Sequence, residues 1–411
     1  MRILHFIPER TDNSDVRKEY FRHLMKMADS VELRIITTDS NTKIDIAEKM
    51  PKILPLLGKK AGKIMDEFHP DILHIHGCTG KYEHKIFNVA QKHRIPVIVS
   101  PLGDLAAITL TERSAVKRLT STASRARTML WNADAIHVTG ELELDTIRKM
   151  QLIPDKDMNK DVGKRIFMIK NSVLTNSITA EIMCQYFVSL YKKISFLRAY
   201  DVMLPDTKRC EKILLRFGNA KHYAKISDEE NKLIKNLNEE ELNKIFIHAE
   251  KENVREIIDL GCKEFGIPFT PDRKTCRERA GIDDNENEEE KPVFTDLDKI
   301  RSKYKKDLRT FENYQDETDL FCLIASSHNL IQKGCLTYRH LAEICNTLIK
   351  TNYNEDVAQK MFKDMKFYDY AARLMYIMND YMGLPEGFMP LAPINDKKTE
   401  ETNNLLTLKS R

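Results

Sequence analysis

Two histidines lie at the end of an apolar run, where the sheet of an α/β protein would present them to a ligand. His74 and His76 alternate with the apolar residues of the segment 72–75, and Gly77 follows them. Such a short apolar run bounded by a glycine predicts a buried strand that ends near His76. His74 lies among apolar neighbours, so we expect it to pack in the core. His76 is a candidate catalytic residue, with a structural role as the alternative.

A second pair of candidate residues follows the next predicted strand. The β-branched run 97–99 leads into Gly103 and Asp104. The strands at 72–75 and 97–99, joined by a predicted helix at 81–93, form one crossover unit, which brings their carboxyl ends to the same edge of a parallel sheet. A glycine there lets a ligand approach the backbone. Asp104 is therefore a second candidate catalytic residue, unless it caps a helix that follows it.

The rest of the first half supplies further strands and helices in alternation. Apolar runs predict the remaining strands at 2–8, 31–37, 133–139 and 165–169. Helical spacing predicts helices at 15–27 and 141–150 and a largely helical segment at 42–68, with Pro51 and Pro55 near a break. This alternation predicts an α/β fold with a Rossmann-like, doubly wound parallel sheet. His137 lies on the predicted strand at 133–139 and is expected to be structural.

Helical patterns dominate the second half of the chain. We predict a Rossmann-like domain at 1–176, a helical region at 177–280, an acidic flexible linker at 281–296, a helical module at 297–395 and a frayed tail at 396–411. The linker is predicted from the acidic, proline-containing sequence GIDDNENEEEKPVFTD, whose composition disfavours a packed core.

Composition and charge exclude several classes of protein. The 411 residues include 66 basic and 62 acidic side chains, a net charge of +4, and no basic cluster interleaved with aromatic residues, so we expect no nucleic-acid partner. No apolar run reaches the ~18 residues that span a membrane, and the first residues lack the pattern of a signal peptide. We expect a cytoplasmic protein with reduced cysteines. No GxGxxG follows the first strand, which argues against a nicotinamide-dependent oxidoreductase.

Four residues in the second half could suggest a zinc site. His328, Cys335, His340 and Cys345 are close in sequence, but their spacing matches no familiar ligand pattern. Cys345 also lies in an apolar run. We therefore expect structural roles for them, and neither a metal nor a cofactor.

Four ordered segments of the first half resemble a known enzyme family. They are DILHIHG (71–77), HRIPVIVSPLGDL (93–105), WNADAIHVTGELELDTIR (131–148) and RIFMIKNSV (165–173). Together they resemble the N-terminal domain of bacterial family-4 glycosyltransferases of the GT-B type. The resemblance covers under half of the chain.

The resemblance implies a transferase that moves a sugar from a nucleotide-sugar donor to a glycan or lipid-linked acceptor in cell-surface polysaccharide synthesis, without a metal. It implies catalytic roles for His76 and Asp104, because an imidazole or carboxylate can hydrogen-bond a sugar and stabilise an oxocarbenium-like centre. By the same resemblance, Gly77, Gly103, Glu141 and Asn171 are substrate-binding residues, and Arg10 in the first loop is a further candidate beside them. Glu141 could instead begin a helix, and Asn171 could be a turn residue.

The sequence departs from the family's pattern in two places, and these departures favour a second function as the alternative. The first loop, PERTDNSD (8–15), lacks the paired glycines of the family, although Arg10 could contact an anion there. The second half lacks the glycine-rich donor site. A catalytically inactive, glycosyltransferase-like scaffold that binds a partner is therefore the alternative. The basic residues within 113–127 could contact an anionic acceptor or the inner membrane surface, or simply form the solvated face of a helix.

Overall fold

The computed structural model describes residues 1–9, 15–38, 47–105, 116–149, 165–220, 222–282 and 293–407. The chain forms two compact units, Met1–Val202 and Met203–Arg411. Arg10 and residues 283–292 of the predicted linker lie outside the described residues.

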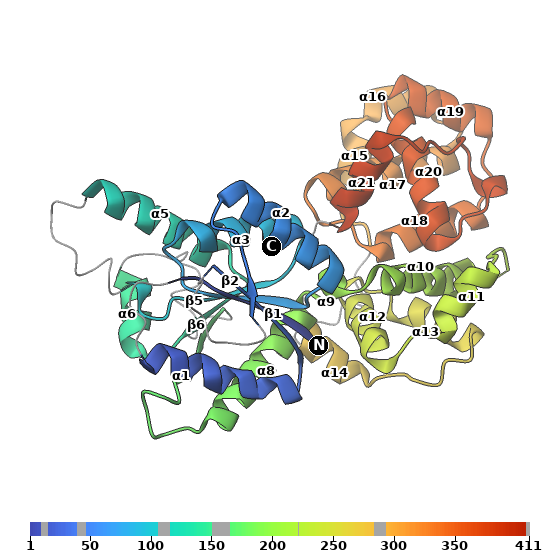
Figure 1. Cartoon of the computed structure of the whole chain (residues 1–411). Helices are drawn as coiled ribbons and strands as arrows, with labels where there is room; N and C mark the ends of the chain where they lie inside the picture. The colour runs from blue at the N-terminus through green and yellow to red at the C-terminus, as the bar shows by residue number, and fades with distance from the viewer. Residues whose placement is uncertain are drawn as a thin grey trace. The chain divides into compact units, whose positions relative to one another are not determined.

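A seven-stranded parallel sheet is the centre of the first unit (Figure 1). The strands are β1 (Arg2–Ile7), β2 (Glu32–Thr37), β3 (Ala47–Lys49), β4 (Ile72–His76), β5 (Val97–Ser100), β6 (Ala135–Val138) and β7 (Ile166–Met168). Their spatial order is β3-β2-β1-β4-β5-β6-β7, and every neighbouring pair is parallel. This confirms the predicted Rossmann-like sheet, with one strand more than the sequence indicated.

The additional strand corrects the first part of the segment predicted to be largely helical at 42–68, whereas the predicted break near Pro51 and Pro55 agrees with the start of α2. Within that range the structure has β3 and then α2, which begins only at Leu54 and carries Pro55 in its first turn. Proline lacks a backbone N–H and is tolerated only in the first turn of a helix. A helix therefore cannot run through Pro55 from an earlier start.

Helices cover both faces of the sheet (Figure 1). The helices of the first unit are α1 (Asp15–Leu24), η1 (Met25–Asp29), α2 (Leu54–Phe68), α3 (Lys81–Lys92), α5 (Val116–Asn132), α6 (Glu141–Lys149), α8 (Ala180–Leu197) and α9 (Ala199–Val202). One core, under α2, α3 and α5, packs apolar side chains of the sheet such as Phe6, Leu73 and Val99 against these helices. The opposite core lies under α1 and α8, and it is on this face that the sheet carries its histidines.

Helix α8 extends the first unit beyond residue 176, where we had predicted the domain to end. It buries Met183, Phe187, Tyr191 and Ile194 in the core on the histidine face of the sheet. The first unit therefore runs to Val202. The boundary lies later than predicted because a buried parallel sheet needs helices on both faces.

The second unit is helical throughout its described residues, as predicted. Its helices are α10 (Pro205–Ala220), α11 (Asp228–Lys235), α12 (Glu239–Lys251), α13 (Arg255–Glu264), α14 (Arg273–Ala280), α15 (Leu297–Lys303), α16 (Lys305–Leu308), α17 (Gln315–Gln332), α18 (Tyr338–Lys350), α19 (Glu355–Asp364), α20 (Tyr368–Met382) and α21 (Lys397–Thr407), with the short turns η4 (Arg309–Phe311) and η5 (Glu386–Phe388).

Helix α21 corrects the frayed tail predicted at 396–411. Asp396 accepts a hydrogen bond from the backbone N–H of Thr399, 2.8 Å away, in the first turn of this helix. Leu406 near its other end is buried. A satisfied first turn and a buried apolar residue hold the segment in place. Across the described part of the chain, no helix is both long and apolar enough to cross a membrane.

Candidate functional site

The candidate site lies where the strand order of the sheet reverses. From β1 the chain order continues outward to β2, whereas β4 continues to β5 on the other side. Doubly wound sheets bind their ligands outside the carboxyl ends of the strands at such a switch point. His76 is the last residue of β4, and His5 on β1 lies beside His74 in the register of the two strands.

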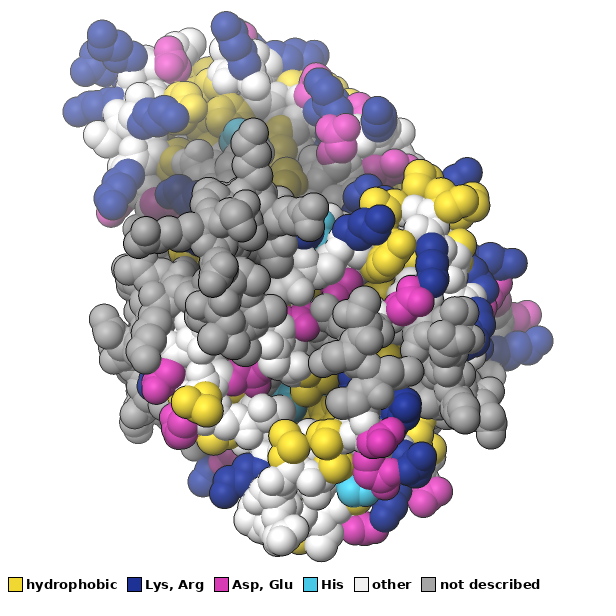
Figure 2. All heavy atoms as spheres, turned by 60° about the vertical axis from the view of Figure 1, so that its left-hand side comes forward, with side chains coloured by type: hydrophobic (Ala, Val, Ile, Leu, Met, Phe, Trp, Pro, Cys, Tyr) yellow, Lys and Arg dark blue, Asp and Glu magenta, His cyan; other side chains and the backbone are white. Residues whose placement is uncertain are grey.

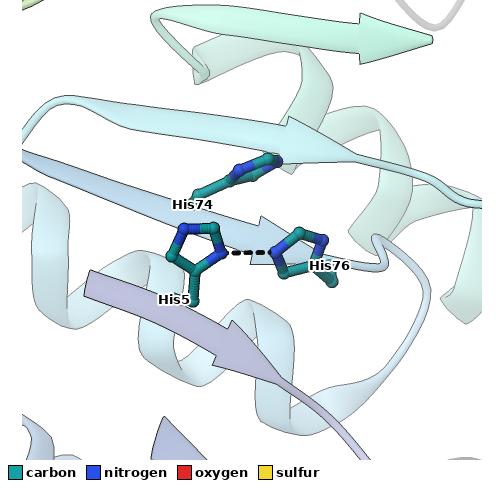
Figure 3. Close-up of side chains that lie close together, drawn as sticks. All are labelled: His5, His74 and His76. Atoms are coloured by element: carbon teal, nitrogen blue, oxygen red, sulfur yellow. Dashed lines mark hydrogen bonds between the residues drawn. The ribbon is translucent and has the colours of Figure 1, made fainter. Parts of the chain in front are cut away.

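Three imidazoles from these two strands form a buried cluster (Figure 3). His5 Nδ1 and His76 Nε2 are 2.8 Å apart, so one nitrogen donates a hydrogen bond and the other accepts it. The other nitrogens of this pair, His5 Nε2 and His76 Nδ1, have no hydrogen-bond partner among the described residues. The side chains of His5, His74 and His76 are fully buried.

His74 also belongs to a series of hydrogen bonds in which the donor and the acceptor of every bond are determined. His137 Nε2 lies 2.9 Å from the carbonyl oxygen of Ile169, which can only accept, so His137 carries its proton on Nε2. His137 Nδ1 therefore accepts from Ser100 Oγ at 2.7 Å, and Ser100 Oγ accepts from His74 Nε2 at 2.6 Å. The remaining nitrogen, His74 Nδ1, accepts from the hydroxyl of Tyr191 at 2.7 Å. Each imidazole in this series is neutral and has a fixed tautomer.

Burial keeps these histidines neutral. It lowers the pKa of His5 to about 3 and that of His137 to about 4, since a charged imidazole would lose its hydration. It also lowers the pKa of His74 and of His76 well below the ordinary value, and the neighbouring histidines add to the effect. A neutral imidazole offers a lone pair to a proton or to a metal ion.

Asp104, the second candidate catalytic residue, joins the loops that follow β4 and β5. Its Oδ2 accepts hydrogen bonds from the backbone N–H groups of Cys78 at 2.9 Å and Thr79 at 3.3 Å, and from the hydroxyl of Thr79 at 3.1 Å. The carboxylate of Asp104 therefore holds the two loops together in this conformation. Both loops belong to the edge of the sheet that we predicted from the sequence.

The two candidate glycines shape these same loops. Gly77 has φ of 127° and donates its N–H to the carbonyl of Ser100 at 2.7 Å. Gly103 has φ of 85°, in the left-handed region that favours glycine, and donates its N–H to Glu143 Oε1 at 3.0 Å. The other oxygen of Glu143 accepts from the N–H of Thr139 at 2.9 Å. Glu143 thus connects the loops after β5 and β6, a role that we did not predict.

An open pocket of about 420 Å³ lies between these two loops. It is lined by Gly103, Leu105, Thr139, Gly140, Glu141, Leu142, Glu143 and Thr146. Glu141, a predicted substrate-binding residue, is exposed at the start of α6. A side-chain carbon added at Gly140 would meet no atom within 4 Å. Two of the predicted binding residues, Gly103 and Glu141, therefore share one pocket.

Asn171 follows β7 and lies in a turn. Its side-chain oxygen accepts a hydrogen bond from the N–H of Val173 at 2.9 Å, and its backbone carbonyl accepts from Leu174 and Thr175. This is the turn role that we considered as the alternative to substrate binding. Asn171 is buried.

The predicted basic face at 113–127 is described only in part. Arg125 donates from Nε to the carbonyl of Thr79 at 2.9 Å, and the guanidinium of Arg127 lies 5.1 Å from the ring centroid of Trp131. Arg125 thus contacts the loop that follows β4. In the view of Figure 2, basic and acidic side chains are interspersed over the described surface.

Sequence reasoning missed His5, Tyr191 and Ser100 as members of the site. A signal for His5 was present, because Ile3-Leu4-His5 repeats the residue types of Ile72-Leu73-His74 at the same place in a strand. The residue types of Tyr191 and Ser100 carry no such signal, since only the packing of α8 and β5 brings them to His74.

The second-half residues that could suggest a zinc site make other contacts in the described structure. The cluster of His5, His74 and His76 is the group there with metal-ligand geometry, and it includes neither His340 nor Cys345. Instead, His340 contacts Thr337, and Cys345 accepts from the amide of Asn219.

Comparison with known proteins leaves the family open. No protein-family model and no curated protein matches the chain. The fold defines the first unit as a Rossmann-like, doubly wound α/β domain. Its carboxyl edge offers an open pocket with an exposed carboxylate, and a buried set of neutral imidazoles lies behind that edge.

Proposed function

We propose that the chain is a glycosyltransferase-like protein whose first unit binds a glycan or lipid-linked acceptor at the carboxyl edge of its sheet and takes part in sugar transfer from a nucleotide sugar. The observation that carries the proposal is the pocket between the loops after β5 and β6. It lies along the edge where doubly wound sheets bind ligands, and two residues chosen from the glycosyltransferase resemblance line it.

The lining of the pocket suits a sugar. The exposed carboxylate of Glu141 can accept hydrogen bonds from sugar hydroxyls, and Thr139 offers a hydroxyl. Gly103 and Gly140 leave room for a ring to approach the backbone, because no atom of the described residues lies within 4 Å of the place where either side chain would begin.

Thermal melting of the full chain against UDP, GDP, CMP and their common sugar conjugates tests the proposal. A donor at 100 times its dissociation constant should stabilise the fold by about 2.7 kcal/mol. The pocket is proposed for the acceptor. The variant Gly140→Trp places a large side chain there, so it should abolish sugar transfer to glycan acceptors and keep the donor-induced shift. The matched control is Gly387→Trp, in η5 of the second unit, where an added side chain also meets open space.

Sugar transfer that survives Gly140→Trp would move acceptor binding away from this pocket. Transfer that disappears equally in Gly387→Trp would indicate a general effect of the added tryptophan. Either result would contradict the proposed site.

The alternative function is a glycosyltransferase-like scaffold without catalysis. Two observations favour it. His76 is fully buried and Asp104 is bound to backbone N–H groups, so neither candidate catalytic residue faces a substrate in this conformation. The described part of the second unit also has no strand, and thus no second Rossmann-like sheet for a donor. If no nucleotide or sugar conjugate shifts the melting temperature, the scaffold function is favoured. The next experiment would then use the helical second unit as bait to capture a protein partner.

A further inference from the structure

We propose that His5, His74 and His76 bind a transition-metal ion of the kind that prefers imidazole nitrogen, Zn²⁺ or Cu⁺. The inference is independent of the proposed sugar transfer, because it concerns the interior of the sheet and not the pocket at its edge.

The strand register creates the cluster. His5 on β1 and His74 on β4 are partners in the parallel ladder, and His76 lies two residues further along β4. Because side chains alternate between the faces of a strand, all three project from the same face, as Figure 3 shows. They thus meet between adjacent strands of the rigid centre of the sheet.

The distances are close to those of a metal site. Each histidine offers one ring nitrogen, and the three nitrogens lie within 4.8 Å of one another. His5 Nδ1 and His76 Nε2 are 2.8 Å apart. Zinc–nitrogen bonds of about 2.0–2.1 Å place tetrahedral ligands roughly 3.3 Å from each other. Side-chain rotations would bring the three nitrogens around one ion, while the proton between His5 and His76 moves to the second nitrogen of the ring that carried it, so that each ligand stays a neutral imidazole.

The hydrogen bonds of His74 prepare its ring for coordination. Its Nε2–H donates to Ser100, so the lone pair is on Nδ1. Metal-binding histidines usually donate their second ring N–H in this way, which fixes the tautomer and the orientation of the ring. The hydroxyl of Tyr191, which donates to that lone pair, would have to rotate when an ion binds.

The hydrogen bonding of His5 and His76 is less complete than that of the neighbouring residues His74, Ser100 and His137. In the series through His74, Ser100 and His137, each ring nitrogen and the hydroxyl has a partner. Among the described residues, one nitrogen of His5 and one of His76 have none. Buried polar groups with a purely structural role are nearly always hydrogen-bonded. The second nitrogen of each ring is instead available to carry the N–H of a ligand whose other nitrogen binds an ion.

The donor set selects the type of ion. The cluster contains imidazoles and neither a carboxylate nor a thiolate. Neutral imidazole suits Zn²⁺ and copper, whereas Mg²⁺ and Ca²⁺ require oxygen ligands.

The test uses the untagged full chain, stripped with a chelator and then dialysed against Zn²⁺, or against Cu⁺ under reducing, anaerobic conditions. Elemental analysis should find one ion of one of these metals per chain. His5→Asn and His76→Asn should each weaken binding at least tenfold. The control is His69→Asn, at the exposed end of α2, where φ of 46° suits asparagine. It should bind as the wild type does.

A second measurement uses the wild-type protein, so the test does not depend on variants that could fail to fold. X-ray absorption of the metal-loaded wild type should show nitrogen ligands with the scattering pattern of imidazole. Retention of zinc alone identifies Zn²⁺, and retention of copper alone identifies Cu⁺. No retained ion, sulfur ligands, or undiminished binding in the folded double variant H5N/H76N would overturn the proposal.

Discussion

At the scale of single residues, His340 has a position at the start of α18 that glutamate or glutamine usually occupies. Its Nδ1 accepts a hydrogen bond from the N–H of Thr337 at 3.1 Å. In the common capping box, a Glu or Gln side chain makes this bond. A histidine can make it only while Nδ1 is unprotonated, so the start of this helix depends on pH.

Burial lowers the pKa of His340 below its ordinary value of 6.5, although a hydrogen bond to the backbone of Val293 and the nearby Asp296 oppose the effect. As the pH falls through about 6.5, the unfolded chain therefore takes up this proton before the folded chain does. The free energy of unfolding then decreases by up to about 1.4 kcal/mol per pH unit between the two pKa values. This contribution is present above pH 6.5 and is lost on acidification.

We expect His340→Gln to keep the melting temperature at pH 7.5 and to make its decline toward pH 5 less steep, because glutamine caps the helix without titrating. His340→Ala should remove the cap and lower stability by about 1 kcal/mol at pH 7.5, and this loss should shrink toward pH 5 as the wild-type histidine is protonated. Thermal melting of the three proteins across this pH range measures both effects. An unchanged pH dependence in the glutamine variant would show that His340 does not carry this proton linkage.

At the scale of elements, α10 and α13 approach closely at a pair of glycines. A side-chain carbon built at Gly218 would lie 1.8 Å from the carbonyl oxygen of Ile257, and one built at Gly261 would lie 2.2 Å from that of Leu214. Each glycine thus faces the backbone of the other helix. Neither backbone can move aside as a flexible side chain could.

Gly218→Ala and Gly261→Ala should each destabilise the protein by about 1–3 kcal/mol or more, because the two helices must separate. The sign is opposite to the usual effect, since Gly→Ala in a helix normally stabilises by up to about 1 kcal/mol. Gly62→Ala in α2 is the control, because its added carbon would make only an ordinary contact, 3.4 Å from His93. Urea unfolding would compare them, and a neutral result at Gly218 would mean that the helices are not in close contact there.

The sequence predicted the strands and helices better than the contacts between them. Apolar runs located six strands, because strands buried on both faces are almost entirely apolar. The strand β3 was missed because its sequence Ala-Glu-Lys has no β-branched residue. Within the site, glycines and strand-end polar residues were predictable from their positions. The contacts of His5 with His76 and of Tyr191 with His74 depend on the register and packing of segments distant in sequence, which local patterns do not encode.

At the scale of the whole molecule, α8 completes the first unit although it follows the last strand. It covers the histidine face of the sheet and supplies the hydroxyl of Tyr191 to His74. It also connects back to the N-terminal part of the unit, because Glu181 pairs with Lys26 at 2.6 Å.

A fragment of residues 1–202 should therefore fold, whereas a fragment of residues 1–176 should not. The shorter fragment lacks α8 and exposes the apolar face that this helix covers. Circular dichroism melting and amide exchange of the two fragments would measure the difference. A cooperative transition in the 1–176 fragment would contradict the structural role that we assign to α8.

The position of α8 also constrains how the protein is made. The ribosome delivers β1 before the six other described strands, yet β1 becomes an interior strand, with β2 on one side and β4 on the other. Helix α8, which seals one face of the sheet, is synthesised after all seven of these strands. Until then the nascent chain presents an uncovered apolar surface, of the kind that holding chaperones bind and that promotes aggregation. Slower translation just before residue 180 would prolong that vulnerable interval.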